Sequence, residues 1–296
     1  WTVLTQGDGG DVKVDNITLA AQDRSIRYSS YQNLSGLTRR TFNASGVQVA
    51  SAVCQLTPQG GSPAIQPQFY TPVELNAVQP TRLLIGAANG IYESLDQGAT
   101  VNRLLFGSPG DGLSGIGMRY GGRKSGVDVP AVAYVVDGDW VYFRNSLGSF
   151  VPGTQVPTGG DILLDVCMDT NDYVKSWIID KNQVFYSSNS SASWSAVTGD
   201  LLPVADNLRC ITFLPNSAGG AICVGSKTGV YIMSTAEPGV WKRFGINLPA
   251  SAYVYDLRYN AEDDVLVAGT MGRGVWMMNN AAASSTGSGI GDWHSY

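Results

Sequence analysis

The sequence is poor in the residues that most enzymes use for acid–base and metal chemistry. It has one histidine, His294, close to the end of the chain. A Ser-His-Asp triad needs a histidine held rigidly between a nucleophile and an acid, which a frayed chain end does not provide. Metal sites rich in histidine are excluded for the same reason. We therefore expect neither triad chemistry nor a bound metal.

Cysteine is also scarce. Four cysteines are too few for a disulfide-stabilised scaffold in a chain of 296 residues. None of them forms a Cys-x-x-Cys pair, so a zinc site is not expected. Cys210 and Cys223 could face each other across a predicted hairpin and form a disulfide. We expect buried free thiols instead, because cysteine often packs as a small apolar residue. No glycine-rich phosphate loop precedes a helix-like segment, so no nucleotide cofactor is expected.

Charge is low and net negative. Charged residues make up 15% of the chain, and 24 acidic against 19 basic residues give a net charge of −5. This balance implies no basic face, so nucleic acid and an anionic membrane surface are not expected as partners. The longest apolar runs are short, such as residues 131–136, so no membrane insertion is expected.

Glycine is plentiful, at 36 residues, and much of it belongs to a repeated pattern. The pattern is an apolar strand, a small turn, and a second strand that begins with Val or Ile, usually before an aromatic residue. Clear copies occupy residues 83–92, 222–231 and 266–276, and weaker copies occupy residues 133–142 and 177–185. The first copy consists of a predicted strand at Thr18–Ala21 and a second at Ile26–Tyr28. The second strands of the six copies contain Ile26, Ile91, Val141, Val184, Val230 and Val275.

The spacing of these copies predicts the fold. Four of the five intervals between them lie near the ~40–50-residue period of propeller blades. Each copy also has an upstream and a downstream strand, and four short strands per unit are typical of a blade. The first interval is longer, which we interpret as an insertion at residues 44–68. That insertion could be a lid, a protein contact or an inert loop.

The sequence therefore predicts an all-β, six-bladed β-propeller of four-stranded antiparallel blades over residues 1–278. We expect the N-terminal strand Trp1–Leu4 to close the ring by pairing with Gly274–Met278, because an unpaired edge strand is a liability. A fragment of a seven-bladed or larger assembly is the alternative. Residues 279–296 are rich in Ala, Ser and Gly at first, and are predicted to be a tail or linker.

One predicted turn carries a family pattern. Residues 94–100 read Ser-Leu-Asp-Gln-Gly-Ala-Thr and resemble the Asp box, Ser-x-Asp-x-Gly-x-Thr-Trp, with Val101 in place of tryptophan. Residues 187–194 resemble a degraded copy, and the glycine-rich stretches 7–10 and 269–276 also look similar. The chain thus resembles the Asp-box (BNR-repeat) β-propellers, which include sialidases, xyloglucan-type glycoside hydrolases and non-catalytic relatives.

The resemblance places the Asp box between the third and fourth strands of a blade. There Asp96 can accept backbone N–H groups and Gly98 can take a positive φ, so we predict that Asp96 is structural. Propeller ligands usually meet the opposite face, where second-to-third-strand turns and blade connections lie. The charged and amide residues predicted on that rim are Asp8, Asp23, Arg24, Asn89, Asp137, Asp139, Lys227 and Arg273.

This rim suits sugar recognition, although any set of solvated turns contains similar residues. Asp8 is the one candidate catalytic residue, and Asp23, Asp111 or Asp139 could supply the second carboxyl group that glycoside hydrolysis needs. Alternatively, Asp8 only shapes its glycine-rich turn. The sequence lacks the Arg-Ile-Pro motif of sialidases and has only four glutamates. We therefore assign no catalytic residue from the sequence, and Asp8 remains the one candidate.

We expect a binding or structural module for carbohydrate or protein, secreted or at the cell surface. The rival hypothesis is a glycoside hydrolase, or another polysaccharide-cleaving enzyme, with paired carboxylates on the rim. The start at Trp1 without Met fits a mature secreted chain or a piece of a larger multidomain protein. Four Asn-x-Ser/Thr sequons, at Asn16, Asn33, Asn43 and Asn189, are compatible with export.

Overall fold

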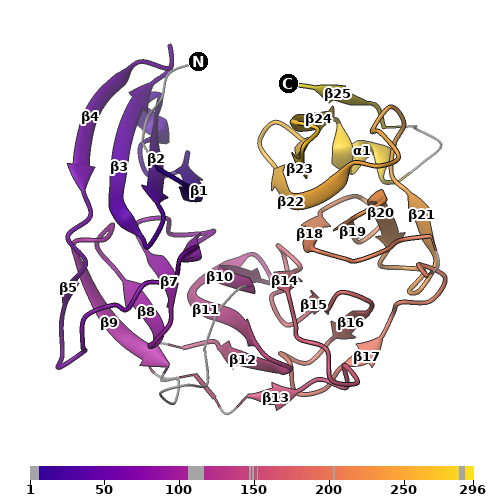
Figure 1. Ribbon diagram of the computed structural model, residues 1–296, viewed down its shortest axis with the longest axis horizontal. Helices are drawn as coiled ribbons and strands as arrows, with labels where there is room; N and C mark the ends of the chain where they lie inside the picture. The colour runs from indigo at the N-terminus through magenta and orange to yellow at the C-terminus, as the bar shows by residue number, and fades with distance from the viewer. Residues whose placement is uncertain are drawn as a thin grey trace. The chain divides into compact units, whose positions relative to one another are not determined.

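The computed structural model describes residues 7–105, 117–146, 148, 150–151, 153–202, 204–286 and 291–296. These residues form six sheets in chain order, each with four antiparallel strands (Figure 1). The predicted six-bladed β-propeller is confirmed. The chain divides into two compact units, of which the first holds the first two sheets and most of the third, and the second holds the remainder.

The first two sheets occupy residues 9–105. The first contains β1 (Gly9–Asp15), β2 (Arg24–Tyr31), β3 (Ser35–Asn43) and β4 (Gln48–Val53). The second contains β6 (Val73–Leu75), β7 (Leu83–Ala87), β8 (Gly90–Ser94) and β9 (Thr100–Leu105). A further short strand, β5 (Thr57–Pro58), pairs in parallel with β9.

The other four sheets follow the same order of strands. The third contains β10 (Gly117–Lys124), β11 (Val127–Asp137), β12 (Trp140–Arg144) and β13 (Thr154–Gln155). The fourth contains β14 (Asp165–Met168), β15 (Ser176–Ile179), β16 (Val184–Ser187) and β17 (Ser195–Ala196). The fifth contains β18 (Cys210–Leu214), β19 (Ala221–Ser226), β20 (Gly229–Ser234) and β21 (Trp241–Arg243). The sixth contains β22 (Tyr253–Asn260), β23 (Val265–Met271), β24 (Val275–Asn279) and β25 (Trp293–Ser295).

The middle strands of the sheets explain the apolar runs in the sequence. All residues of β7, β8 and β19 are buried. A strand buried on both faces reads as a continuous apolar run rather than as an alternating pattern. Five of the six Val or Ile residues that mark the repeat lie on the third strand of their sheets.

The first copy of the repeat was assigned to the wrong strands. Ile26 lies on the second strand, β2, and residues 18–21 form no strand but lead into a short 3₁₀ helix, η1 (Ala20–Gln22). The cause is Asp15, whose carboxylate Oδ1 accepts the backbone N–H groups of Ile17 and Thr18 at 3.0 and 2.8 Å. This cap ends β1 and turns the chain. Residues 44–68 are accordingly not one inserted loop, because they contain β4 and β5.

The predicted pairing of Gly274–Met278 with Trp1–Leu4 was also wrong. Both edges of β24 are occupied, one by β23 and the other by β25, and residues 1–6 lie outside the described part of the chain. The outer strand of the sixth sheet thus comes from the segment that the sequence predicts as a tail. Trp293 anchors this strand, because it is 1% exposed and its indole Nε1 donates to the carbonyl of Phe244 at 2.8 Å.

Two aspartates tie the innermost strands of neighbouring sheets together. In the first unit, Asp11 on β1 accepts the backbone N–H of Val73 on β6 at 3.0 Å. In the second unit, Asp165 on β14 accepts the N–H of Ile211 on β18 at 3.0 Å. A carboxylate that accepts a backbone N–H in the adjacent sheet joins two sheets by a charge-assisted hydrogen bond.

All four cysteines are buried and free, as predicted. On the β18–β19 hairpin, Cys210 lies opposite Gly225 and Cys223 opposite Thr212, so the two thiols are not directly opposed. Burial raises the pKa of both thiols well above the ordinary value. Among the described residues, no helix is long and apolar enough to cross a membrane.

Candidate functional site

The structure places most of the predicted rim residues in the expected turns. Asn89, Lys227 and Arg273 lie between the second and third strands of their sheets, and Asp137 and Asp139 flank the corresponding turn of the third sheet. Asp23 and Arg24 are the exception: Asp23 lies between β1 and β2 and Arg24 begins β2, so their assignment to a second-to-third-strand turn was wrong. Asp8 immediately precedes β1, and Asp111 lies outside the described residues.

Several of these residues make local contacts. The side chain of Asn89 binds the backbone N–H of Gln66 and the carbonyl of Ala64, both at 3.0 Å. Asp139 accepts a hydrogen bond from Gln155 at 2.7 Å. These contacts stabilise turns.

The charged residues of the rim also contact neighbouring protein groups. Lys227 Nζ lies 3.7 Å from the carboxylate of Asp206, and both side chains are exposed. Asp8 exchanges hydrogen bonds with Gln32 through its backbone N–H and its carbonyl. Asp23 has a left-handed φ of 53° and ends η1. The rim as a ligand site therefore stays a prediction.

The turn that resembles the Asp box forms the contacts expected of a structural turn. It joins β8 to β9, and Asp96 accepts hydrogen bonds from the Ser94 hydroxyl at 2.8 Å and from the N–H and hydroxyl of Thr100 at 2.9 and 2.7 Å. Partial burial opposes ionisation, but the bonds from Thr100 and Ser94 outweigh it and hold the pKa of Asp96 below its usual value. Gly98 has a φ of +83°, and a Cβ there would lie 2.8 Å from Cys54.

The degraded copy in the fourth sheet has the same arrangement with asparagine in place of aspartate. Asn189 Oδ1 accepts the Ser187 hydroxyl at 2.9 Å and the N–H of Ser193 at 3.0 Å. Its amide Nδ2 donates to the Ser193 hydroxyl at 2.8 Å. The two turns therefore differ in charge and in the direction of one hydrogen bond, because the Thr100 hydroxyl donates to Asp96 whereas Asn189 donates to the Ser193 hydroxyl. The other two hydrogen bonds of each side chain correspond.

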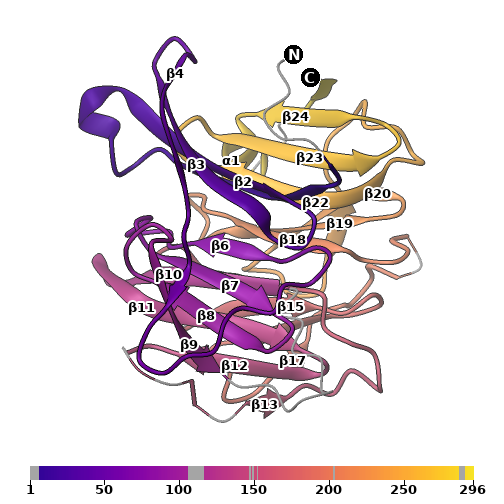
Figure 2. The same cartoon turned by 60° about the vertical axis from the view of Figure 1, so that its left-hand side comes forward.

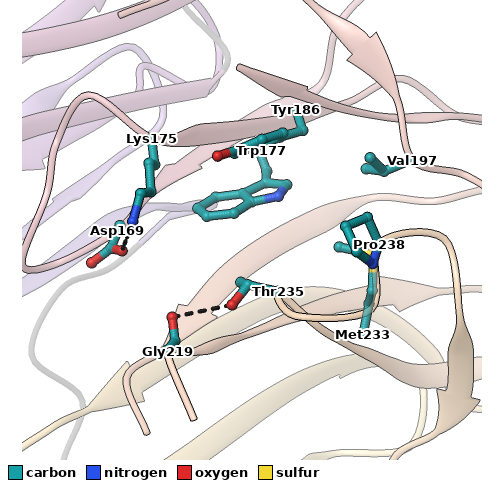
Figure 3. A pocket seen from close by; sticks show the side chains of 9 residues that line it. All are labelled: Asp169, Lys175, Trp177, Tyr186, Val197, Gly219, Met233, Thr235 and Pro238. Carbon is teal, nitrogen blue, oxygen red and sulfur yellow. Dashed lines mark hydrogen bonds and ion pairs between the residues drawn. The ribbon is translucent and has the colours of Figure 1, made fainter. Parts of the chain in front are cut away.

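A pocket of about 120 Å³ opens between the fourth and fifth sheets, inside the second unit. Its lining comes from β15, β16 and β20, from the residue after β17, and from turns that join first to second and third to fourth strands. These turns lie at the opposite end of the strands from Lys227. It was not predicted from the sequence. The residues that line it are Asp169, Lys175, Trp177, Tyr186, Val197, Gly219, Met233, Thr235 and Pro238 (Figure 3).

Trp177, on β15, is the central residue of this pocket. It lies opposite Tyr186 in the β15–β16 register, and their rings stack with centroids 4.9 Å apart. The ring of Phe213, on β18 of the next sheet, stacks on Trp177 at 5.7 Å. Packing leaves Trp177 only 3% exposed, so the pocket meets little of its ring surface. The indole Nε1 donates no hydrogen bond to any described residue, and Figure 3 shows it on the side of Val197 and Pro238.

One end of the pocket is charged. Asp169, 6% exposed, accepts the N–H of Asn171 through Oδ1 at 2.8 Å and has Oδ2 3.9 Å from Lys175 Nζ. The ammonium group of Lys175 is also 3.9 Å from Asp172, in the same turn. Figure 3 shows Asp169 and Lys175 beside the six-membered ring of the indole. A ligand entering here meets a carboxylate and a half-exposed ammonium group together.

The opposite wall is apolar. Val197 and Met233 are buried, and Pro238 lies in the exposed turn between β20 and β21. The turn is held by Thr235, whose hydroxyl donates to the carbonyls of Gly219 and Gly220 at 3.1 Å each. The pocket thus combines an apolar wall, an indole N–H donor and an ion pair, which is the composition of a binding site with a few orienting polar groups.

The pocket contains one lining carboxylate, Asp169. Canonical glycoside hydrolysis uses two carboxyl groups about 5–9.5 Å apart across the scissile bond. The arrangement around Trp177 can accept and orient a ligand, and its own lining does not supply such a pair.

No family model matches the chain, and no curated protein matches it either. Solved structures share its fold at low sequence identity. A catalytically inactive virginiamycin B lyase from Staphylococcus aureus, solved with quinupristin, is 11% identical with a TM-score of 0.58, covering 96% of this chain and 89% of the lyase. YCF48 bound to D1 peptide is 10% identical with a TM-score of 0.58, covering 98% of this chain and 82% of YCF48.

An ancestral GH74 enzyme is 10% identical with a TM-score of 0.55, covering 99% of this chain. The present chain spans about half of that enzyme, 47% of its length. These proteins are a lyase, a glycoside hydrolase and a peptide-bound protein, so the shared propeller does not by itself assign an activity.

Proposed function

We propose that the chain is a polypeptide-binding module and that the pocket between the fourth and fifth sheets receives one apolar side chain of its ligand. The observation that carries this proposal is the size and lining of the pocket. Its volume of about 120 Å³ is slightly smaller than an apolar cavity of about 150 Å³ known to bind benzene. A side chain such as leucine or methionine fits that space.

The position of Trp177 favours a polypeptide over a carbohydrate. Aromatic recognition of a sugar uses an open ring face, and Trp177 is 3% exposed because Tyr186 and Phe213 stack on it. A pyranose ring with its hydroxyl groups is also larger than benzene. The contacts of Trp177 in this pocket therefore support an inserted side chain rather than a stacked sugar.

The polar groups of the pocket suit a peptide backbone. The indole N–H of Trp177 can donate to a peptide carbonyl, since no described residue accepts it. Asp169 and Lys175 can bind a backbone N–H or an opposite charge next to the inserted side chain. The similarity in fold to a protein solved with a bound peptide agrees with this choice of ligand.

Two further parts of the proposal concern family and location. Membership of the Asp-box propellers is supported by the hydrogen-bonding frames around Asp96 and Asn189. Action outside the cytoplasm, in a secreted or cell-surface protein, is supported only by the sequons in the sequence. Binding of carbohydrate at the rim that includes Asp8 and Arg273 is the competing hypothesis.

The test uses small probes of both classes. The ¹⁵N-labelled chain is titrated with N-acetyl amino-acid amides and, separately, with monosaccharides, and the indole N–H resonance of Trp177 is followed by NMR. We expect the leucine and methionine amides to shift this resonance and Trp177→Phe to weaken their binding about tenfold, the effect of about 1.4 kcal/mol from one lost hydrogen bond.

Trp140→Phe is the matched control, because Trp140 is 40% exposed on β12 and lies outside the pocket. It should leave binding of the amides unchanged. A shift of the Trp177 resonance by monosaccharides alone would contradict the proposal. Turnover of a polysaccharide that is lost in Asp8→Ala would replace it with the hydrolase hypothesis.

A further inference from the structure

Among the described residues, the outermost strand of the first sheet, β4, pairs with another strand along one edge only. Its partner within the sheet is β3, and its other side faces away from the sheet (Figure 2). All six of its residues are exposed. Alternate residues of such a strand turn their N–H and C=O groups outward, where another strand can pair with them.

The outer strands of the other described sheets do not offer an edge of this kind. Those of the third and fourth sheets have two residues each, and those of the fifth and sixth have three. The second sheet has a long outer strand, β9, but β5 covers it by pairing Thr57 with Thr100 and Pro58 with Val101. Within the described part of the chain, one long edge is thus covered by β5, and no strand covers β4.

The sequence of β4 lacks the features that protect an edge. Residues 43–57 contain no Lys, Arg, Asp, Glu or Pro. Val47, Val49 and Val53 are 57%, 45% and 59% exposed. Natural proteins blunt exposed edges with charge, proline or very short strands, and β-branched residues favour pairing. The strand therefore lacks the usual protection of an exposed edge against pairing.

We propose that β4 pairs antiparallel with the β4 strand of a second copy of this chain, in a two-fold symmetric dimer. A two-fold axis brings residues near the middle of the strand opposite themselves or their close neighbours, so any charge there would meet its own kind. The uncharged sequence of β4 avoids this repulsion. A strand that selects a foreign peptide usually does so with charges or side-chain pockets, and the described residues of β4 provide neither.

The dimer should be weak and dependent on concentration. Six residues per strand bury less surface than the roughly 1,200 Å² of a stable interface. The inference is independent of the pocket beside Trp177, because the two features lie in different compact units. Loss of dimerisation would thus leave peptide binding intact.

Ala50 is the position for the test. It is exposed at the middle of β4 and lies opposite Thr41 of β3, so no charged residue is directly opposite it in the sheet. Arg39 is a diagonal neighbour on the same face, and the two opposite charges introduced at Ala50 separate its effect from that of the dimer. Sedimentation velocity over a range of concentrations should show a monomer–dimer equilibrium for the wild-type chain. Ala50→Lys and Ala50→Glu, each alone, should weaken the dimer at least about tenfold, because like charges face each other across the new strand pair.

An equimolar mixture of the Ala50→Lys and Ala50→Glu chains should recover the dimer, since opposite charges then meet across the axis. Ser195→Lys adds the same charge to the exposed outer strand β17 and should leave the equilibrium unchanged. Unchanged melting temperatures confirm that the variants fold. A wild-type chain that stays monomeric at every concentration, or single variants that dimerise as the wild type does, would overturn the proposal.

Discussion

The buried ion pair between Glu93 and Arg144 gives a quantitative test of the packing in the first unit. Glu93 lies on β8 and Arg144 on β12, and their side chains are 7% and 1% exposed. Arg144 Nη2 is 2.5 Å from Glu93 Oε1, and the hydroxyl of Tyr120, on β10, donates to the same oxygen at 2.5 Å. Arg144 also donates to the carbonyls of Ala131 and Gly148.

Removing one partner leaves a buried charge without its counterion, which costs about 3–5 kcal/mol. Glu93→Gln keeps the shape of the side chain and should lower the free energy of unfolding by about that amount. Arg144→Met should cost at least as much, because two carbonyls also lose their donor. The double variant removes both charges, so its loss should be smaller than the sum of the single losses by about 2 kcal/mol.

Urea unfolding at neutral pH, followed by circular dichroism, measures all four corners of this cycle. Arg123 and Asp128 supply the control pair, because their side chains are 44% and 47% exposed although their atoms approach to 2.7 Å. The same cycle on that pair should give a coupling of at most about 1 kcal/mol. If the losses at Glu93 and Arg144 simply add, the two side chains do not act as one buried unit and the reasoning fails.

Two further predictions concern the tyrosines and the structural turns. Burial, joined by the charge of Glu93, raises the pKa of Tyr120, and burial likewise raises that of Tyr28, so the folded chain holds both phenols neutral where the unfolded chain ionises them. The free energy of unfolding should therefore fall above about pH 10, by about 1.4 kcal/mol per pH unit for each tyrosine. Tyr120→Phe should remove the part of this pH dependence that Tyr120 contributes, as measured by urea unfolding from pH 9 to 11. At the turn between β8 and β9, Asp96→Ala should lower stability by about 1–2 kcal/mol because three hydrogen bonds are lost, whereas Asp96→Asn should cost less than about 1 kcal/mol, since Asn189 already holds the equivalent turn of the fourth sheet. Thermal unfolding compares them, and equal losses for alanine and asparagine would show that the side-chain frame is not what stabilises the turn.

The hairpins of the middle strands could be predicted from the sequence because they are local. An apolar run, a short turn with glycine or asparagine and a second apolar strand identify β7 with β8 and β19 with β20 without knowledge of the rest of the chain. The first sheet was harder, because Thr18–Ala21 has strand-like composition and the effect of Asp15 on the turn depends on a side-chain contact.

Pairings between strands that are distant in the sequence could not be predicted from local sequence patterns. β25 is separated from β24 by α1 (Ala281–Ser284) and the residues after it, so its sequence looks like a tail until Trp293 is seen buried beside Met278. The pocket was missed for a related reason. The Trp177–Tyr186 pair follows from the hairpin register, but Met233 and Pro238 reach it only through the packing of the next sheet.

Each described sheet takes its four antiparallel strands from one continuous stretch of chain. Ribosomes deliver a chain from its N-terminus, and a sheet built this way can form as soon as its own last strand emerges. β25 shows that this holds for the sixth sheet too, since β22 to β25 follow one another in order. For the strands that the structure describes, synthesis therefore exposes one incomplete sheet at a time, and none of them has to wait for the final residues before its own sheet is complete.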